Sequence, residues 1–129
     1  MLETVQLVLR VTLALVFIGM GVSHFVSPVK RTMAAMIPPR LRRTGLLSPR
    51  NLVAITGVLE IAGGVGLLIP FFTTAAGICL ALFLIAVFPA NAYAASRPEK
   101  FGRIAIPLIP RLIGQIALIA LLLFAVWPA

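Results

Sequence analysis

Cysteine and histidine are almost absent from this chain of 129 residues, which has one of each. The single cysteine, Cys79, excludes an intrachain disulfide, a CxxC redox pair and a thiolate metal cluster made by this chain alone. The single histidine, His24, excludes bis-histidine haem ligation, and together with Glu60 it offers too few ligands for a closed metal site. No serine-centred nucleophile motif is present either. The sequence therefore indicates no metal, no covalent cofactor and no catalytic residues, and it does not point to an autonomous enzyme.

Charged residues are also scarce. They make up 11% of the chain, with three Asp and Glu against eleven Lys and Arg, whereas about a quarter of the residues in soluble domains are charged. Hydrophobic residues reach 61%. A water-soluble domain is therefore the weaker hypothesis.

Four apolar segments instead predict four membrane-spanning helices, at residues 2–25, 50–69, 71–95 and 104–127. Each is long enough to cross a hydrocarbon core of about 30 Å as a helix. The runs lack the alternation of polar and apolar residues that β-barrel strands show. We therefore expect one all-α domain over residues 1–129, an integral membrane four-helix bundle. The first segment has neither a basic n-region nor a clean cleavage site, so we expect it to be retained.

Basic residues gather on one side of these expected spans. Ten of the eleven lie in the first and third connections or at the start of the fourth span: Lys30, Arg31, Arg40, Arg42, Arg43, Arg50, Arg97, Lys100, Arg103 and Arg111. Because basic loops are retained in the cytoplasm, both termini are expected on the extracytoplasmic side of a bacterial inner membrane. The net charge of +8 then needs no nucleic-acid partner, while recruitment of anionic lipid headgroups remains open.

Turn and capping residues separate the expected helices. Ser48 is predicted to be the N-cap of the second span, and Thr73 or Thr74 that of the third. Pro70 predicts a tight hairpin, which would make the second and third spans antiparallel neighbours. The long, basic stretch 26–49 is interrupted by prolines and carries interleaved apolar residues, so we expect it to lie at the membrane surface.

Five polar side chains fall inside or at the edge of the spans. Placing a polar side chain in the hydrocarbon core costs several kcal/mol unless it is paired or faces the interior of the bundle. They are His24, Glu60, Asn91, Arg111 and Gln115. Counted along the helices, all five fall in or near the cytoplasmic half, which predicts one polar, ligand-binding locus with Glu60 paired to Arg111. Gly57 and Gly64 flank Glu60 on the same helix face, where a neighbouring backbone can come close.

A purely structural role remains open for these residues, because buried polar groups also specify which helices pair and in which register. Arg10, the one basic residue elsewhere, is expected to reach outward toward Glu3.

The motifs formed by these residues resemble the DoxX-like family of small four-helix bacterial membrane proteins. They are Gly21-x-x-His24-Phe25-x-x-Pro28, Met36-Ile37-Pro38-Pro39, Gly57-x-x-Glu60-Ile61-x-Gly63-Gly64-x-Gly66-Leu67-x-x-Pro70, Phe88-Pro89-Ala90-Asn91-x-Tyr93 and Arg111-x-x-x-Gln115. The family often has an arginine after the hairpin threonine, where this chain has Ala75. The resemblance implies a small subunit associated with a thiosulfate:quinone oxidoreductase, or a role linked to redox stress or to membrane-protein assembly.

Two functions of different classes follow as expectations. The first is a non-autonomous, redox-associated subunit or a binder of a quinone or lipid-like molecule, whose headgroup meets the five polar residues. The second is a non-catalytic scaffold or assembly factor that docks another membrane protein. A small-solute carrier is a weaker third, since four helices without an inverted repeat would have to form a homo-oligomer.

Overall fold

The chain is all-helical in its computed structural model, which describes residues 1–129 except 43, 46–47, 98–106 and 128–129. The elements in chain order are α1 (Leu2–Ser23), α2 (Ser27–Met36), the short 3₁₀ helix η1 (Pro39–Leu41), α3 (Pro49–Leu68), α4 (Thr73–Ala95) and α6 (Leu108–Val126). Of these, α1, α3, α4 and α6 are each long and apolar enough to cross a membrane. The helical fold class and the four long apolar helices expected from the sequence are thus confirmed.

The ends of the long helices differ from the expected ranges by a few residues. Helix α1 stops at Ser23, and His24 is its C-cap, with a backbone N–H directed at the carbonyls of Gly21 and Val22. The expected start of the fourth span near Ile104 lies outside the described residues, and α6 begins at Leu108.

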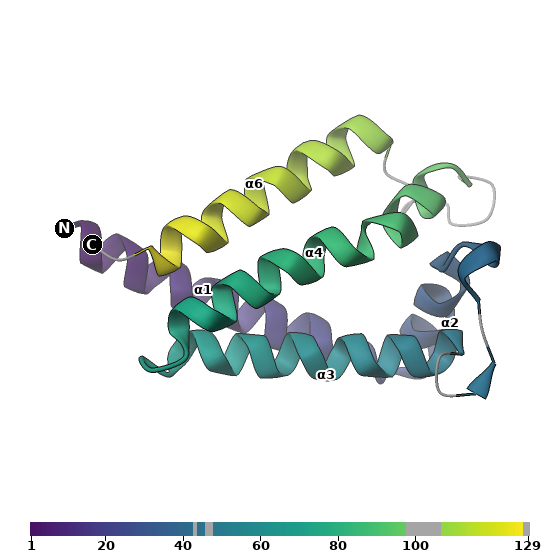
Figure 1. Cartoon of the computed structure of the whole chain (residues 1–129), viewed down its shortest axis with the longest axis horizontal. Helices are drawn as coiled ribbons and strands as arrows, with labels where there is room; N and C mark the ends of the chain where they lie inside the picture. The colour runs from purple at the N-terminus through teal and green to yellow at the C-terminus, as the bar shows by residue number, and fades with distance from the viewer. Residues whose placement is uncertain (43, 46–47, 98–106, 128–129) are drawn as a thin grey trace.

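The four long helices pack around a shared core, with α3 against α1 and α4, and α6 against α4 and α1. Helices α3 and α4 form the expected antiparallel hairpin (Figure 1). The start of α1, the end of α6 and the α3–α4 turn lie together at one end, here called the terminal end (Figure 1). Helix α2 lies at the opposite end, here called the basic end.

Packing is tightest toward the terminal end. The core consists of Leu13, Ala14, Phe17, Leu67, Ala76, Leu80, Leu84, Leu122, Ala125 and Val126. On α6, the buried residues Leu122, Ala125 and Val126 all fall in the last turns. From there α6 diverges from α1 and α3 as it runs back toward the basic end (Figure 1).

The sequence prediction is confirmed for the N-cap of α3 and wrong for the N-cap of α4. The Ser48 side chain accepts a hydrogen bond from the Asn51 N–H, as expected of an N-cap. At α4 the predicted threonine cap is wrong, because the N-cap is Phe72 and no side chain caps the helix. The Thr73 hydroxyl instead donates to the carbonyls of Leu67 and Ile69 at the end of α3, where helical carbonyls lack intrahelical partners.

The described part of the stretch between α1 and α3 contains two short helices that the sequence prediction did not assign. It contains α2, which begins at Ser27-Pro28, where a proline costs no helical hydrogen bond. The Arg42 guanidinium donates to the carbonyls of Ala35 and Ile37 and so ties η1 to the end of α2.

Candidate functional site

A buried pair, His24 and Glu60, joins α1 to α3. His24 Nε2 lies 3.1 Å from Glu60 Oε2. The two residues are 3% and 7% exposed, respectively. An ionisable side chain so deeply enclosed needs a partner of matching chemistry, and each of these two supplies it to the other.

The contacts of the second ring nitrogen, Nδ1, indicate which nitrogen of His24 carries a proton. His24 Nδ1 lies 3.0 Å from the Val53 carbonyl oxygen and 3.1 Å from Thr56 Oγ1, while the Thr56 hydroxyl donates to the same carbonyl at 2.8 Å. A carbonyl can only accept, so Nδ1 carries a proton. On the other side of the ring, Nε2 faces Glu60 Oε2 in a close polar contact.

Three glycines allow α1 and α3 to come close enough for this pair to form. A Cβ on Gly57 would lie 2.8 Å from His24 Cβ and 2.9 Å from the Gly21 carbonyl oxygen, and one on Gly21 would lie 2.7 Å from the Gly57 oxygen. One on Gly64 would lie 2.9 Å from the Ala14 oxygen. The close backbone approach expected at Gly57 and Gly64 is therefore confirmed, and it brings the C-terminal end of α1 against Glu60.

A second polar pair joins α4 to α6. Arg111 Nη1 donates to Asn91 Oδ1 at 3.2 Å. Gln115 lies one turn farther along α6 on the face of Arg111, and all three side chains are half-buried. Asn91 follows Pro89, which lies inside α4 without ending the helix.

The expected ion pair between Glu60 and Arg111 is wrong, because their helices are not neighbours. Within the described residues, α3 packs mainly on α1 and α4, whereas α6 packs on α4 and α1. Glu60 therefore pairs with His24, and Arg111 with Asn91. The five predicted site residues form one pair between α1 and α3, a second pair between α4 and α6, and Gln115 beside the second pair, instead of one bonded cluster.

A third polar group at the terminal end was not predicted as a group. Gln6, only 3% exposed, donates from Nε2 to the carbonyls of Phe124 and Trp127, both at 2.9 Å. Arg10 donates to the Ala125 carbonyl at 2.9 Å, and the Thr74 hydroxyl donates to the Val126 carbonyl at 3.4 Å. The last carbonyls of α6 are thus satisfied by side chains of α1 and α4.

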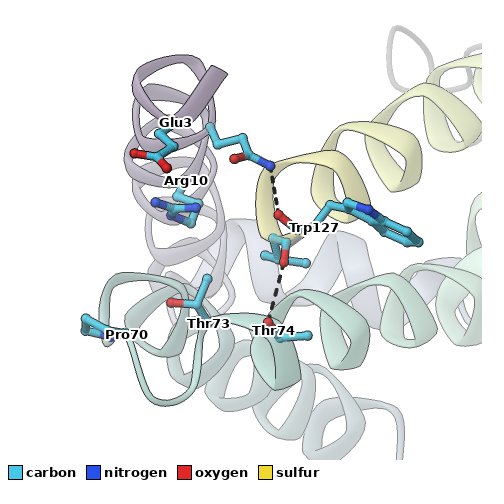
Figure 2. A pocket seen from close by; sticks show the side chains of 8 residues that line it. Glu3, Arg10, Pro70, Thr73, Thr74 and Trp127 are labelled. Atoms are coloured by element: carbon cyan, nitrogen blue, oxygen red, sulfur yellow. Dashed lines mark hydrogen bonds between the residues drawn. The ribbon is translucent and has the colours of Figure 1, made fainter. Parts of the chain in front are cut away.

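Figure 2 shows this group around a cavity of about 340 Å³, whose other lining residues include Glu3 and Thr73. Arg10 was expected to reach toward Glu3, and its bond to α6 gives it a structural role instead. The spacing of Glu3, Gln6 and Arg10, which places them on one face of α1, is the sequence signal that could have identified the group. Likewise Thr56, one turn before Glu60, could have been identified as a partner of the buried pair.

The described residues hold no group of three His, Cys, Asp or Glu side chains placed to bind a metal ion. Cys79 is a free, exposed thiol.

Comparison with known proteins identifies a family but no individual relative. No curated protein and no solved structure matches the chain. One family model, described as a domain of unknown function (DUF8561), matches residues 13–127. That range includes both polar pairs and all but the first turns of α1, so the chain belongs to the DUF8561 family.

Proposed function

We propose that the protein spans a bacterial inner membrane four times, with the basic end in the cytoplasm, and binds a quinone or a similar lipid-like molecule at the polar face of α6. Support for insertion comes from the outer faces of the helices, where large apolar side chains such as Leu15, Leu82 and Ile113 are 64%, 61% and 62% exposed. Such surfaces are stable in lipid and unstable in water.

One observation about α6 carries the proposed binding site. Arg111, Gln115, Leu118 and Leu122 lie on one face of this helix. Leu122 is fully buried, yet Arg111 and Gln115 are only half-buried. Among the described residues, this face is therefore closely packed at one end and less closely packed where its polar residues lie. A ligand that completes the packing would meet a guanidinium group and an amide at a depth otherwise surrounded by apolar side chains.

These residues suit a molecule with an oxygen-bearing head and an apolar body. A guanidinium group has five N–H donors and binds an oxygen acceptor by a charge-assisted hydrogen bond. Gln115 adds an amide on the same side, and the apolar residues of α6 face the rest of the molecule.

The resemblance to DoxX-like proteins supports a redox-associated role, in which the chain is a subunit that holds a quinone for a partner enzyme. The proposal concerns binding, and any electrons would come from that partner's cofactor.

Binding of a decyl-substituted benzoquinone to purified protein in nanodiscs tests the site. Wild-type protein should bind the quinone, and Arg111→Ala and Gln115→Leu should weaken binding by about 5- to 100-fold, which corresponds to losing one charged or neutral hydrogen bond. Arg50→Ala is the matched control because Arg50 is exposed at the start of α3. A wild-type protein that neither binds the probe nor co-purifies with quinone would refute the proposal.

A scaffold function is the second candidate, and Gly114 favours it. This glycine is exposed on α6, and a Cβ there would meet nothing within 4 Å, so a partner helix could approach closely. Co-purification of one stoichiometric membrane partner that is lost in Gly114→Leu and retained in Arg111→Ala would favour this function over ligand binding.

A further inference from the structure

The cavity at the terminal end is lined by one acidic and one basic side chain that are not paired with each other. Glu3 and Arg10 lie on one face of α1, separated by a rise of about 10 Å along the helix, and both line the cavity (Figure 2). Within the described residues, neither side chain forms an ion pair. The cavity therefore presents two opposite charges to a molecule that enters it.

Arg10 keeps hydrogen-bond donors for such a molecule. One of its N–H groups donates to the Ala125 carbonyl at 2.9 Å, and this is the one hydrogen bond that its side chain forms among the described residues. A guanidinium group has five N–H donors and binds phosphate oxygens by charge-assisted hydrogen bonds. The bond to Ala125 also holds the guanidinium group at the end of α6, so its position does not depend on a ligand.

The other polar groups of the lining offer hydrogen-bond acceptors. Gln6 is only 3% exposed, and its Nε2 donates to two carbonyls at the end of α6, which fixes the orientation of the amide. Its Oε1 accepts no hydrogen bond from the described part of the chain. The hydroxyls of Thr73 and Thr74 donate their protons to helix-end carbonyls, and their oxygens remain acceptors. Together with the Glu3 carboxylate, these groups suit a cation that carries N–H donors.

Exposed aromatic side chains indicate that the cavity lies at the level of the lipid headgroups. Trp127 lines the cavity and is 68% exposed, and Phe71, in the adjacent α3–α4 turn, is 86% exposed. Tryptophan concentrates where the hydrocarbon core meets water. Farther along α4 from Thr74, the side chains of Ile78 and Leu82 are 46% and 61% exposed. A headgroup in the cavity would therefore have an apolar helix face beside it for an acyl chain.

We propose that this cavity binds the headgroup of one zwitterionic aminophospholipid, with the phosphate at Arg10 and the primary ammonium group at Glu3 and Gln6 Oε1. The cavity volume of about 340 Å³ is at the low end of the range for small-molecule pockets, about 300–1,000 Å³. This size suits a headgroup whose acyl chains lie outside, along α4. The inference rests on the membrane insertion proposed above but not on quinone binding, because Arg111 and Gln115 do not line this cavity.

Native mass spectrometry of the full chain in detergent tests the site, with phosphatidylethanolamine, phosphatidylcholine and phosphatidylglycerol of identical acyl chains as probes. Wild-type protein should retain one phosphatidylethanolamine at concentrations where the other two lipids are lost. The reason is that the trimethylammonium group of phosphatidylcholine has no N–H donor, and the glycerol headgroup carries no positive charge. Equal retention of the three lipids would refute the proposal.

Glu3→Gln tests the position of the ammonium group. This variant should reduce the preference for phosphatidylethanolamine over phosphatidylcholine by about 2- to 5-fold, as expected for an exposed pair of charges. Glu3 forms no hydrogen bond or ion pair within the described residues, so the variant should fold like the wild type. Arg31→Gln, which removes an exposed charge from α2, is the control and should leave the preference unchanged. An unchanged preference in Glu3→Gln would refute the assigned geometry.

Thr74→Phe tests the cavity itself. A ring at this position should fill most of the space and abolish the one-to-one complex, whereas Ala75→Phe adds the same ring at the next exposed position, outside the lining, and should bind like the wild type. Equal binding by the two variants would refute a site in this cavity. Displacement of the lipid by an equal concentration of free phosphoethanolamine would show that the acyl chains contribute nothing, and it would refute a lipid as the ligand. Quinone binding is measured separately on the same preparation, so failure of one proposal is distinguishable from failure of the other.

Discussion

At the scale of single residues, the environment of Glu60 determines what a substitution does there. The partner of the carboxyl group is the imidazole of His24, whose Nδ1 donates to the Val53 carbonyl, so Nε2 of the neutral ring is a hydrogen-bond acceptor. A group at position 60 that donates a hydrogen bond can therefore satisfy Nε2 without carrying charge.

We expect Glu60→Gln to change the free energy of unfolding by less than about 1 kcal/mol, because the new amide donates to His24 Nε2. Glu60→Leu should cost about 1–3 kcal/mol, since it leaves Nε2 buried without a partner. Unfolding by sodium dodecyl sulfate in mixed micelles, followed by circular dichroism, measures both. If the partner of Glu60 were an arginine, Glu60→Gln should lower the free energy of unfolding strongly. That result would contradict the structure.

The sequence could predict that Glu60 needs a partner, but it could not predict which one. The cost of burying a charge follows from the residue type and its depth along the span, both of which can be read from the sequence. The identity of the partner depends on which helices are neighbours. His24 was a candidate at the right depth, yet only the order of the helices around the core selects it over Arg111.

Gln6 offers a second test at this scale. Its buried side chain donates to two carbonyl groups at the end of α6, and Gln6→Leu removes both hydrogen bonds and leaves the Phe124 carbonyl only the bond from the Trp127 N–H. We expect a loss of about 1–3 kcal/mol in unfolding free energy and faster amide exchange in the last turn of α6. Thr12→Val is the control, because the exposed Thr12 hydroxyl donates only within its own helix, to Val8. Equal effects of the two substitutions would show that Gln6 is not specifically required.

At the scale of helices, hydropathy alone located the four long helices, whereas the conformation of α2 was not predicted. Apolar runs of about 20 residues leave few alternatives to a helix in lipid, and Ser48 marked the start of α3. The stretch that contains α2 has mixed polarity and several prolines, so its helical content depends on tertiary bonds such as those of Arg42. Thr73 or Thr74 was predicted to cap the start of α4, but their hydroxyls donate to carbonyls at the ends of α3 and α6. The sequence could not separate these roles, because a hydroxyl can bond a helix-end carbonyl as well as a helix-end N–H.

The contact between α1 and α3 makes a sharp prediction about glycine. Gly57→Ala and Gly64→Ala each place a methyl group within 3.0 Å of opposing backbone or side-chain atoms, which should separate the helices at a cost of about 1–3 kcal/mol. Gly114→Ala is the matched control on α6, where nothing lies within 4 Å, and it should be neutral or gain up to about 1 kcal/mol through helix propensity. Thermal unfolding in detergent ranks the three variants. Tolerance of alanine at both Gly57 and Gly64 would show that α1 and α3 are farther apart than described.

At the scale of the whole molecule, packing and charge are arranged along the same axis. The closely packed core lies toward the terminal end, while most basic loop residues and the half-packed polar face of α6 lie toward the basic end. The proposed quinone site on α6 therefore lies toward the end of the molecule that carries most of the basic loop residues. Orientation in the membrane decides which leaflet supplies its ligand.

The orientation can be measured by cysteine accessibility. In a Cys79→Ser background, Phe71→Cys introduces a thiol at the α3–α4 turn, where Phe71 is 86% exposed, and Thr44→Cys introduces one in the exposed loop before α3. Because basic loops remain in the cytoplasm, a membrane-impermeant maleimide should label Phe71→Cys in spheroplasts and label Thr44→Cys only after permeabilisation. The reverse pattern would place the basic end outside, and the proposed quinone site would then face the outer leaflet. Labelling of both positions in sealed spheroplasts would contradict a single membrane orientation altogether.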